Sequence, residues 1–154
     1  MLKYLKEIEK GKVPQINHGK SKTCPTFIYN LIDAIMLTSH HPAAVGEAFI
    51  VTDGLDITWN EFNKKLTEAL GVEFKPVSIP YGVAMAAAKI YYGIHSLLGI
   101  KKEPFLTPYR INNGGKDYHF SIEKIKTTLG FQPSYDLDTA IKMTVEWYMN
   151  IKVK

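Results

Sequence analysis

Apolar residues in the first stretch of the chain recur with the spacing of an α-helix. Leu2, Leu5 and Ile8 fall on one helical face, and Gly11 ends the run. Residues 12–19 then read as a short extended segment around Val13 and Ile16. The pattern therefore predicts a short helix followed by a short extended segment.

The stretch from Thr26 to Thr38 is densely apolar. We expect a brief strand there that passes into a helix near Asn30. The helix should end before Pro42, because proline disfavours helical geometry in the residue that precedes it.

A continuous apolar run, Ala48–Val51, is followed by a turn at Asp53-Gly54. Such a run is typical of a strand buried on both faces of a parallel sheet. We therefore predict a strand over about residues 48–52. A buried parallel strand needs neighbours, and the sequence offers no comparable second run.

The clearest helix start is Thr58-Trp59-Asn60-Glu61, which has the pattern of a capping box. Phe62 and Leu66 continue the apolar face, and Gly71 supplies a left-handed stop. The sequence thus predicts a helix that begins at the capping box and ends before Gly71.

The longest apolar segment runs from Ile79 to Ile100, and Pro80 opens a helix in it that ends near residues 98–99. Its length would span a bilayer, but Lys89 at its middle would cost about 2.5–3.5 kcal/mol to insert. We expect a helix buried on most sides by its own protein. A helix on a membrane surface, or along an apolar pocket, is the alternative.

The last third of the chain contains several turn signals. Residues 104–113 are expected to be irregular, and Gly114-Gly115 to form a turn. Ser121 caps a helix of about nine residues that Gly130 closes. A final helix begins within residues 136–138.

The composition is that of one globular domain. The chain has 154 residues, of which 45% are hydrophobic and 22% charged, so we predict a single unit over residues 1–154. The one cysteine, Cys24, excludes an internal disulfide framework and a four-cysteine metal site. No signal peptide is recognised, so we expect a cytoplasmic protein.

The net charge of +4 is spread along the chain. Among the 19 Lys and Arg residues only Arg110 is an arginine, and no long basic run occurs. Arginine is the residue preferred for phosphate and base-edge contacts, so we do not expect nucleic-acid binding.

The sequence lacks the common motifs of cofactor and metal sites. It contains no G-x-G-x-x-G, G-x-x-G-x-x-G or G-x-x-x-x-G-K-[ST] loop, and its five histidines lack metal-ligand spacing. Tyr148 and Lys152 match Y-x-x-x-K, a match expected about once by chance at this content of tyrosine and lysine. We therefore predict no catalytic, cofactor-binding or metal-binding residue.

Four residues are candidates for contact with a small-molecule substrate. Tyr29, Asn30 and Tyr81 lie where a strand or loop meets a helix, so they could line a pocket; core packing and helix capping are the alternative. Arg110 in its irregular stretch could bind an anionic group, or remain a surface arginine.

Five segments together resemble one family in order and spacing. The chain is similar to the C-terminal part of extended short-chain dehydrogenases/reductases, in the branch of 3β-hydroxysteroid dehydrogenases, dihydroflavonol reductases and NAD-dependent sugar epimerases/dehydratases. The matching segments are TFIYNLIDAI (26–35), PAAVGEAFIVTDG (42–54), ITWNEF (57–62), the segment 124–133 ending in LGFQP, and TVEWY (144–148).

The resemblance implies an α/β to α+β fold: a mostly helical lobe with a few short strands, without the nucleotide-binding half of the Rossmann-type enzyme. In the family the glycine-rich loop, the catalytic serine and the Y-x-x-x-K pair lie upstream of the matched region. The family places Tyr29 and Asn30 at a substrate-facing turn, Arg110 near a phosphate-binding position, and Tyr81 at a helix that borders an apolar pocket or membrane.

Two hypotheses follow. In the first, the chain is the substrate-binding portion of an NAD(P)-dependent oxidoreductase or epimerase (isomerase), truncated and inactive alone. NAD(P) is then implied for the full-length family and not for this chain. Its partner is the missing N-terminal half, or a second copy paired through the edge of Ala48–Val51. In the second, it is a stand-alone module that binds an apolar ligand or a protein.

Overall fold

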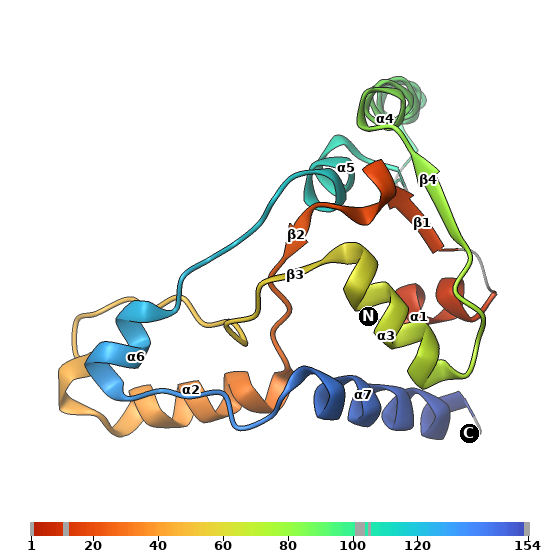
Figure 1. The fold of residues 1–154 in the computed structure, drawn as a ribbon. Coiled ribbons are helices and arrows are strands. Elements are labelled where there is room, and N and C mark those ends of the chain that lie inside the picture. The colour runs from red at the N-terminus through yellow and green to blue at the C-terminus, as the bar shows by residue number, and fades with distance from the viewer. Residues whose placement is uncertain (1, 11–12, 101–103, 105, 153–154) are drawn as a thin grey trace. The chain divides into compact units, whose positions relative to one another are not determined.

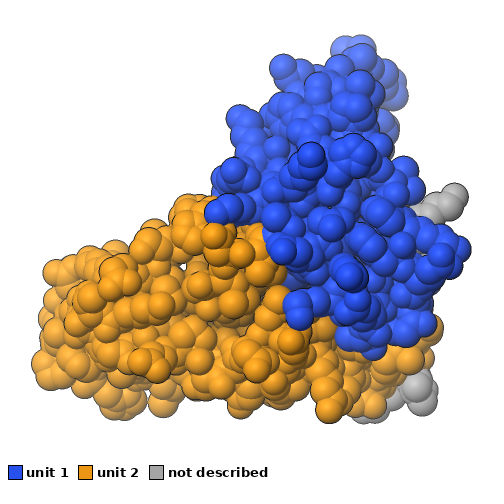
Figure 2. All heavy atoms as spheres, in the orientation of Figure 1, with its two compact units in different colours: residues 1–22, 58–118 blue, residues 23–57, 119–154 orange. Residues whose placement is uncertain are grey.

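The computed structural model describes residues 2–10, 13–100, 104 and 106–152, and they form two compact units. Unit 1 comprises residues 1–22 and 58–118, and unit 2 comprises residues 23–57 and 119–154 (Figure 2). Each unit is assembled from two separate segments of the chain. The sequence had predicted one unit over residues 1–154.

Unit 1 combines helices with a parallel strand pair (Figure 1). Strand β1 runs beside β4 with Val13 opposite Pro76 and Ile16 opposite Ile79. Leu5 and Ile8 of the first helix are buried, as their spacing predicted. The elements of unit 1, in chain order, are α1 (Leu2–Glu9), β1 (Val13–Ile16), the 3₁₀ turn η1 (Asn17–Gly19), α3 (Trp59–Leu70), β4 (Pro76–Ile79), α4 (Tyr81–Leu97) and α5 (Pro108–Gly115).

The regular elements that lie wholly within unit 2 are helices, as far as its residues are described. Its core contains Ala34 of α2 and Ile125 and Leu129 of α6, and Phe49 and Val51 pack against it. Its elements are α2 (Ile28–His40), the 3₁₀ turn η2 (Pro42–Ala44), α6 (Glu123–Leu129) and α7 (Leu137–Lys152). Two short strands, β2 (Lys22–Thr23) and β3 (Ile57–Thr58), form a second two-stranded sheet.

Helix ends with local signals lie where the sequence predicted them. The capping box at Thr58 and Glu61 is formed, and Gly71 ends α3 with a φ of 68°. Gly130 ends α6 in the same left-handed conformation, with a φ of 70°. α6 is shorter than predicted: Ser121 accepts a hydrogen bond from the Glu123 N–H, and the helix begins at Glu123.

Two predicted strands are absent. α2 already begins at Ile28, so the expected strand before Asn30 is not formed. The strand predicted at about residues 48–52 is also absent, because residues 47–56 have no strand assignment. A strand is defined by its ladder with a neighbour, and an apolar run without one stays irregular.

The region around residues 104–115 is more ordered than predicted. α5 covers part of the stretch expected to be irregular and includes Gly114 and Gly115, which were expected to form a turn. The Thr107 side chain accepts a hydrogen bond from the Arg110 N–H, and Pro108 occupies the first helical position. These two signals outweigh the low helix propensity of the glycines.

α4 has the predicted bounds but not the predicted burial. Only Ala84 and Ala88 are buried, while Leu97 is 87% exposed. One face of α4 packs against the rest of unit 1, with Tyr81 and Met85 partly buried, so the expectation of a helix buried on most sides is wrong. Among the described residues, no helix is long and apolar enough to cross a bilayer.

Candidate functional site

The start of α2 is held by the carboxylate of Asp53. The Phe27 backbone N–H lies 3.0 and 2.9 Å from its two oxygens, and no side chain of Phe27 caps the helix. Phe27 is the N-cap residue of α2, so Asp53 accepts from the N-cap N–H as the N3 carboxylate of a capping box does, but from another segment of unit 2.

Asn30 lies in the same network and is fully buried, with an exposure of 0%. Its Nδ2 donates to Asp53 Oδ1 at 2.9 Å and to the Tyr135 carbonyl at 3.0 Å. Its Oδ1 accepts from the Tyr135 N–H at 2.9 Å. Asn30 therefore joins the start of α2 to the turn after residue 52 and to the segment before α7.

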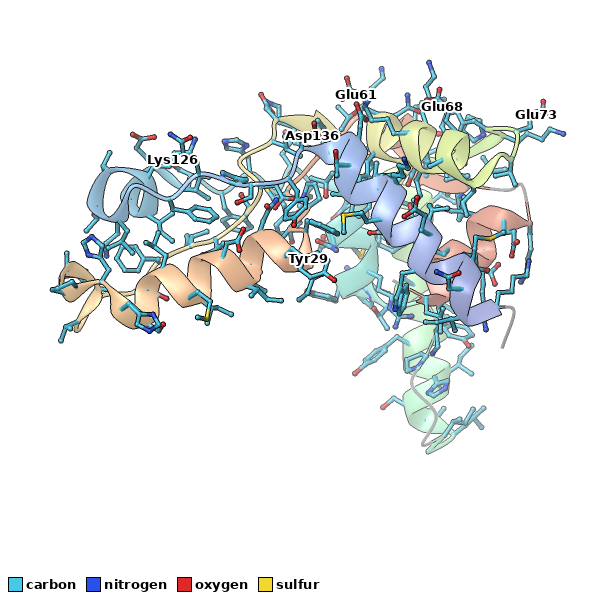
Figure 3. All side chains as sticks on the ribbon, turned by 90° about the horizontal axis from the view of Figure 1, so that it is seen from below. Tyr29, Glu61, Glu68, Glu73, Lys126 and Asp136 are labelled. Atoms are coloured by element: carbon cyan, nitrogen blue, oxygen red, sulfur yellow. The ribbon has the colours of Figure 1, made fainter. Side chains whose placement is uncertain are left out.

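Tyr29 lies beside Asn30 but is 46% exposed. Figure 3 shows it at the start of α2. Its ring centroid is 5.4 Å from that of Phe27 and 5.8 Å from that of Tyr135. The three rings form an aromatic cluster in unit 2 that is open at Tyr29, and an open aromatic face suits contact with an apolar or planar group.

In unit 1, Tyr81 is the first residue of α4, and both its backbone N–H and its side-chain hydroxyl donate hydrogen bonds. Its backbone N–H donates to Asn17 Oδ1 at 2.9 Å, and its hydroxyl donates to Asn112 Oδ1 at 2.6 Å. Gly115 permits this packing, because a Cβ at that position would lie 2.6 Å from Cδ2 of Tyr81. The Tyr81 ring thus has a fixed position beside α5.

Arg110 lies on α5 and is exposed. Its Nη1 donates to the Pro104 carbonyl across a long 3.4 Å. α4 and α5 pack around Ala84, Ala88 and Ile111, with Met85 and Leu106 only partly buried against them. Unit 1 therefore offers an apolar cluster that carries one phenol–amide pair and one guanidinium group.

The structure brings the four candidate residues together in pairs. Tyr29 and Asn30 share the start of α2 in unit 2, and Tyr81 and Arg110 lie on the two packed helices of unit 1. Sequence reasoning missed Asp53, Tyr135 and Asn112, which hold these residues in place. Only Asp53 had a signal, its place in the turn that follows the apolar run of residues 48–51.

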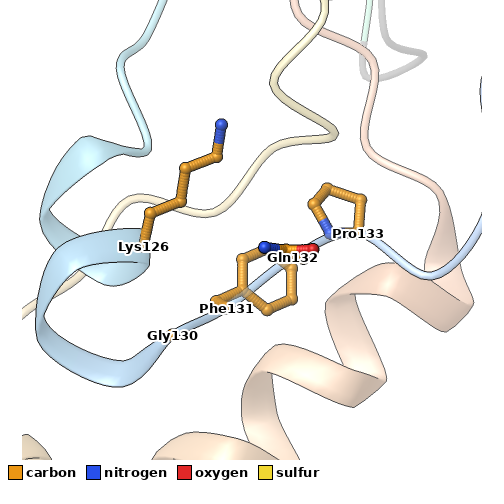
Figure 4. Close-up of a pocket in the computed structure, with 5 residues that line it drawn as sticks. All are labelled: Lys126, Gly130, Phe131, Gln132 and Pro133. Atoms are coloured by element: carbon orange, nitrogen blue, oxygen red, sulfur yellow. The ribbon is translucent and has the colours of Figure 1, made fainter.

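One open pocket of unit 2 contains none of these candidates. It has a volume of about 360 Å³ and follows the end of α6 (Figure 4). Its lining residues are Lys126, Gly130, Phe131, Gln132 and Pro133. This set contains a single ionisable group, so it offers no pair for proton transfer.

The described residues include no group of three or more His, Cys, Asp or Glu side chains arranged to hold a metal ion. Burial raises the pKa of Tyr4 from 10.0 to about 12, against the smaller opposing effect of its hydrogen bond to Asn63. A tyrosine with a pKa that high stays protonated at neutral pH, and its role is to pair with the buried Asn63.

Comparison of the sequence with known proteins finds relatives of one kind. The chain is 31% identical over 153 residues to short-chain dehydrogenase/reductase family 42E member 1 of Bos taurus. It is 27% identical over 150 residues to the decarboxylating sterol-4-alpha-carboxylate 3-dehydrogenase of Mus musculus. It is 32% identical over 113 residues to 3beta-hydroxysteroid-dehydrogenase/decarboxylase isoform 1 of Arabidopsis thaliana. No family model matches the chain.

These relatives are much longer than the matched region. The alignment with the bovine protein covers 92% of this chain but 37% of the relative, and that with the mouse protein covers 93% and 41%. The matched region is the C-terminal part of the relatives. This chain therefore spans about two fifths of the length of the proteins it resembles.

Solved structures show the same fold. An epimerase from Methanothermobacter thermautotrophicus superimposes with a TM-score of 0.69 at 14% identity, over 98% of this chain and 37% of that one. dTDP-glucose 4,6-dehydratase from Bacillus anthracis, in complex with NAD, superimposes with a TM-score of 0.64 at 17% identity, over 99% and 39%. The mostly helical lobe expected from the sequence is thus confirmed as part of a Rossmann-type fold.

Proposed function

Because this chain corresponds to the C-terminal part of extended short-chain dehydrogenases/reductases, we propose that it is the substrate-binding portion of an NAD(P)-dependent oxidoreductase or epimerase acting on a hydroxyl or keto group. One observation carries the proposal. The match extends over nearly all of this chain, while the chain itself contains no glycine-rich dinucleotide loop.

The proposal divides the work between two portions of a longer enzyme. NAD(P) binds to the nucleotide-binding portion, which supplies the phosphate-cradling backbone and the hydride acceptor. This chain holds the substrate and selects it. By itself it binds the cofactor negligibly and transfers no hydride.

The proposed substrate is an apolar molecule with a hydroxyl or keto group. The relatives' names refer to sterols and hydroxysteroids, and unit 1 offers complementary chemistry. Met85 and Leu106 would contact the apolar body, and the Tyr81–Asn112 pair would bind an oxygen. Arg110 would pair with an anionic substituent such as a carboxylate, for which its fork of N–H donors is suited.

Tyr29 and Asn30 have different parts in this proposal. Tyr29 contributes an open aromatic surface in unit 2, while Asn30 positions the turn that presents it. Asn30 acts through its neighbours, because both N–H bonds of its amide already have partners.

Calorimetry on the purified 154-residue chain tests the proposal that cofactor binding requires the nucleotide-binding portion. We expect no heat of binding with NAD or NADP at concentrations up to about 1 mM, a range that contains most enzyme substrate affinities. Micromolar binding of either cofactor would contradict the proposal.

Binding of a fluorescent 3β-hydroxysterol tests the substrate site. Met85→Asp should weaken binding at least about tenfold, because it buries a charge in the apolar cluster of α4 and α5. Ile90→Asp is the matched control on the exposed side of α4 and should leave the affinity unchanged. Equal affinities for the wild type and Met85→Asp would contradict the assignment.

The exposed apolar surface of α4 favours a second candidate function, a stand-alone module that binds an apolar ligand or a protein. Its most exposed apolar residues are Val83, Ile90, Ile94 and Leu97, and the C-cap residue Leu98 is exposed as well. The same two variants separate the functions. Loss of sterol binding in Ile90→Asp together with full binding in Met85→Asp would favour the module.

A further inference from the structure

The turn η1, which follows β1, has a backbone conformation that is uncommon for its residues. Asn17 and His18 have φ values of 46° and 60°, and Gly19 continues the turn with a φ of 66°. In the described part of the chain, no other residue except glycine has a positive φ. The left-handed region costs free energy for a residue with a Cβ, although Asn and His enter it more often than most. Such conformations persist only where the surrounding structure enforces them, and they gather at functional sites.

Two hydrogen bonds hold η1 against the chain around β4. Asn17 Oδ1 accepts from the Tyr81 N–H at 2.9 Å, and Ser78 Oγ accepts from the His18 N–H at 2.9 Å. β1 and β4 lie side by side (Figure 1), so these bonds add side-chain contacts to the strand pair. The left-handed turn thus places the Asn17 side chain at the first residue of α4.

The two strained residues differ in what their side chains do. Asn17 supplies the oxygen that accepts from the Tyr81 N–H. His18 contributes its backbone N–H, and its imidazole makes no hydrogen bond with the described residues. Glycine would fit both positions without strain. At residue 17, however, glycine would offer no acceptor, so the side-chain oxygen is a reason for a strained asparagine to stand there.

Tyr81 is the residue that this bond fixes, and its hydroxyl belongs to the proposed substrate site. The first N–H groups of a helix have no partner within the helix. The preceding residue, Pro80, provides no side-chain cap for α4, so the Asn17 oxygen takes that place. At the other end of the residue, the hydroxyl donates to Asn112 Oδ1 at 2.6 Å.

We propose that Asn17 is a positioning residue of the substrate site. Its amide oxygen fixes the backbone of Tyr81, and this determines where the Tyr81 hydroxyl and Asn112 bind the oxygen of the substrate. Asn17 itself contacts no substrate. The inference rests on the proposed function and adds a residue that determines specificity: a site with a fixed polar pair rejects a ligand that lacks the matching oxygen.

The test compares the affinities of the 154-residue chain for two ligands. One is a fluorescent 3β-hydroxysterol, and the other is the same sterol without its 3-hydroxyl group, the deoxysterol, measured by displacement of the first. The wild type should prefer the hydroxysterol at least about tenfold, because the deoxysterol leaves the polar pair without a partner. Asn17→Gly should reduce this preference to about twofold and leave the affinity for the deoxysterol unchanged. A merely structural loss would lower both affinities together.

Two further variants separate the side-chain oxygen from the strain of the turn. Asn17→Asp keeps an acceptor and tolerates the left-handed region, so it should retain the wild-type preference. His18→Gly relieves the neighbouring strain and keeps the N–H bonded to Ser78, so it should retain the preference too. Circular dichroism and urea unfolding verify that all variants fold. The urea midpoint of Asn17→Gly should stay close to that of the wild type, because the relieved strain offsets the lost hydrogen bond.

A double variant tests whether the effect of Asn17 passes through Tyr81. Tyr81→Phe removes the hydroxyl and should reduce the preference as Asn17→Gly does. Asn17→Gly combined with Tyr81→Phe should weaken hydroxysterol binding less than about twofold beyond Tyr81→Phe alone. The reason is that Asn17 then positions a ring without a hydroxyl.

Four results would overturn this inference and leave the proposed function standing: an unchanged preference in Asn17→Gly, an equal loss in Asn17→Asp, an equal loss in His18→Gly, or losses that multiply in the double variant. Equal wild-type affinities for the two sterols would overturn it together with the assignment of the substrate oxygen to Tyr81 and Asn112. A wild-type chain that binds neither sterol would contradict the proposed substrate site as a whole. The failure of the inference is therefore distinguishable from the failure of the proposed function.

Discussion

Asn30 and Asp53 show how single side chains fix the start of α2. Asp53 accepts from the Phe27 N–H and from Asn30, and Asn30 exchanges two hydrogen bonds with the backbone of Tyr135. Asn30 and Asp53 are buried, so water does not readily replace a partner that either of them loses. The network therefore determines both the position of α2 and that of Tyr29.

Asn30→Ala should lower the free energy of unfolding by about 2–4 kcal/mol, because it leaves the Asp53 carboxylate and the Tyr135 backbone without their partner. Urea unfolding followed by circular dichroism measures the change. Asn150→Ala, at an exposed position of α7, should stay within about 0.5 kcal/mol of the wild type. Equal unfolding midpoints for the two variants would contradict the role of Asn30.

Tyr4 should make the stability depend on alkaline pH. Burial raises its pKa from 10.0 to about 12, so between these values the unfolded chain loses the proton while the folded chain keeps it. The free energy of unfolding should therefore fall by about 2 kcal/mol as the pH rises from 10 to 12. Below pH 10 this contribution is fully present.

Tyr4→Phe isolates this effect from the other tyrosines and lysines. The variant should be less stable at neutral pH, because Asn63 loses a hydrogen-bond donor, and its stability should decline less between pH 10 and 12. Tyr109→Phe, at an exposed position, should keep the wild-type pH dependence. A decline as steep in Tyr4→Phe as in the wild type would contradict the assignment.

At the scale of elements, local capping sets the limits of several helices. The Thr58 hydroxyl accepts from the Glu61 N–H at 3.2 Å, and Glu61 accepts from the Thr58 N–H at 2.7 Å. Gly71 closes the same helix in the left-handed region. α3 thus has a defined signal at each end, both contained within its own sequence.

Thr58→Ala should lower the free energy of unfolding by about 1 kcal/mol, because the Glu61 N–H loses the hydroxyl oxygen that accepts its hydrogen bond and the capping box is broken. Thr58→Ser retains the hydroxyl and should recover most of the loss. The difference between the two urea midpoints is the measurement. A Thr58→Ser variant as unstable as Thr58→Ala would mean that the methyl group, not the cap, is responsible.

At the scale of the whole molecule, the chain forms two units that are interleaved in sequence. Unit 1 takes residues 1–22 and 58–118, and unit 2 takes residues 23–57 and 119–154. Neither unit is therefore a contiguous segment of the chain. A single cut in the chain cannot release either unit with its whole core.

The fragment of residues 1–57 should consequently lack a cooperative unfolding transition, since it holds only the first segment of each unit. Urea titration followed by circular dichroism tests this, with the 154-residue chain as the control. A sigmoidal transition in the fragment would show that a unit folds without its second segment.

The positions of several helices could be predicted from the sequence because the residues that signal them lie within or next to each helix. Leu5 and Ile8 give the buried face of α1, and Pro80 marks the start of α4. The candidate site could be predicted only in part. Asn30 is separated by 23 residues from Asp53 and by 105 from Tyr135, and no spacing in the sequence reveals such a contact.

The sequence by itself determined both ends of α3, the C-terminal end of α6, the bounds of α4 and the resemblance to one family, because each depends on neighbouring residues or on motif order. Only the tertiary structure decided that Ala48–Val51 lacks a ladder, that α5 is helical, and that α4 and one face of α2 are exposed. Burial and strand pairing are properties of a residue and its partners in space. Where a partner is absent from the chain, an apolar pattern does not say what will cover it.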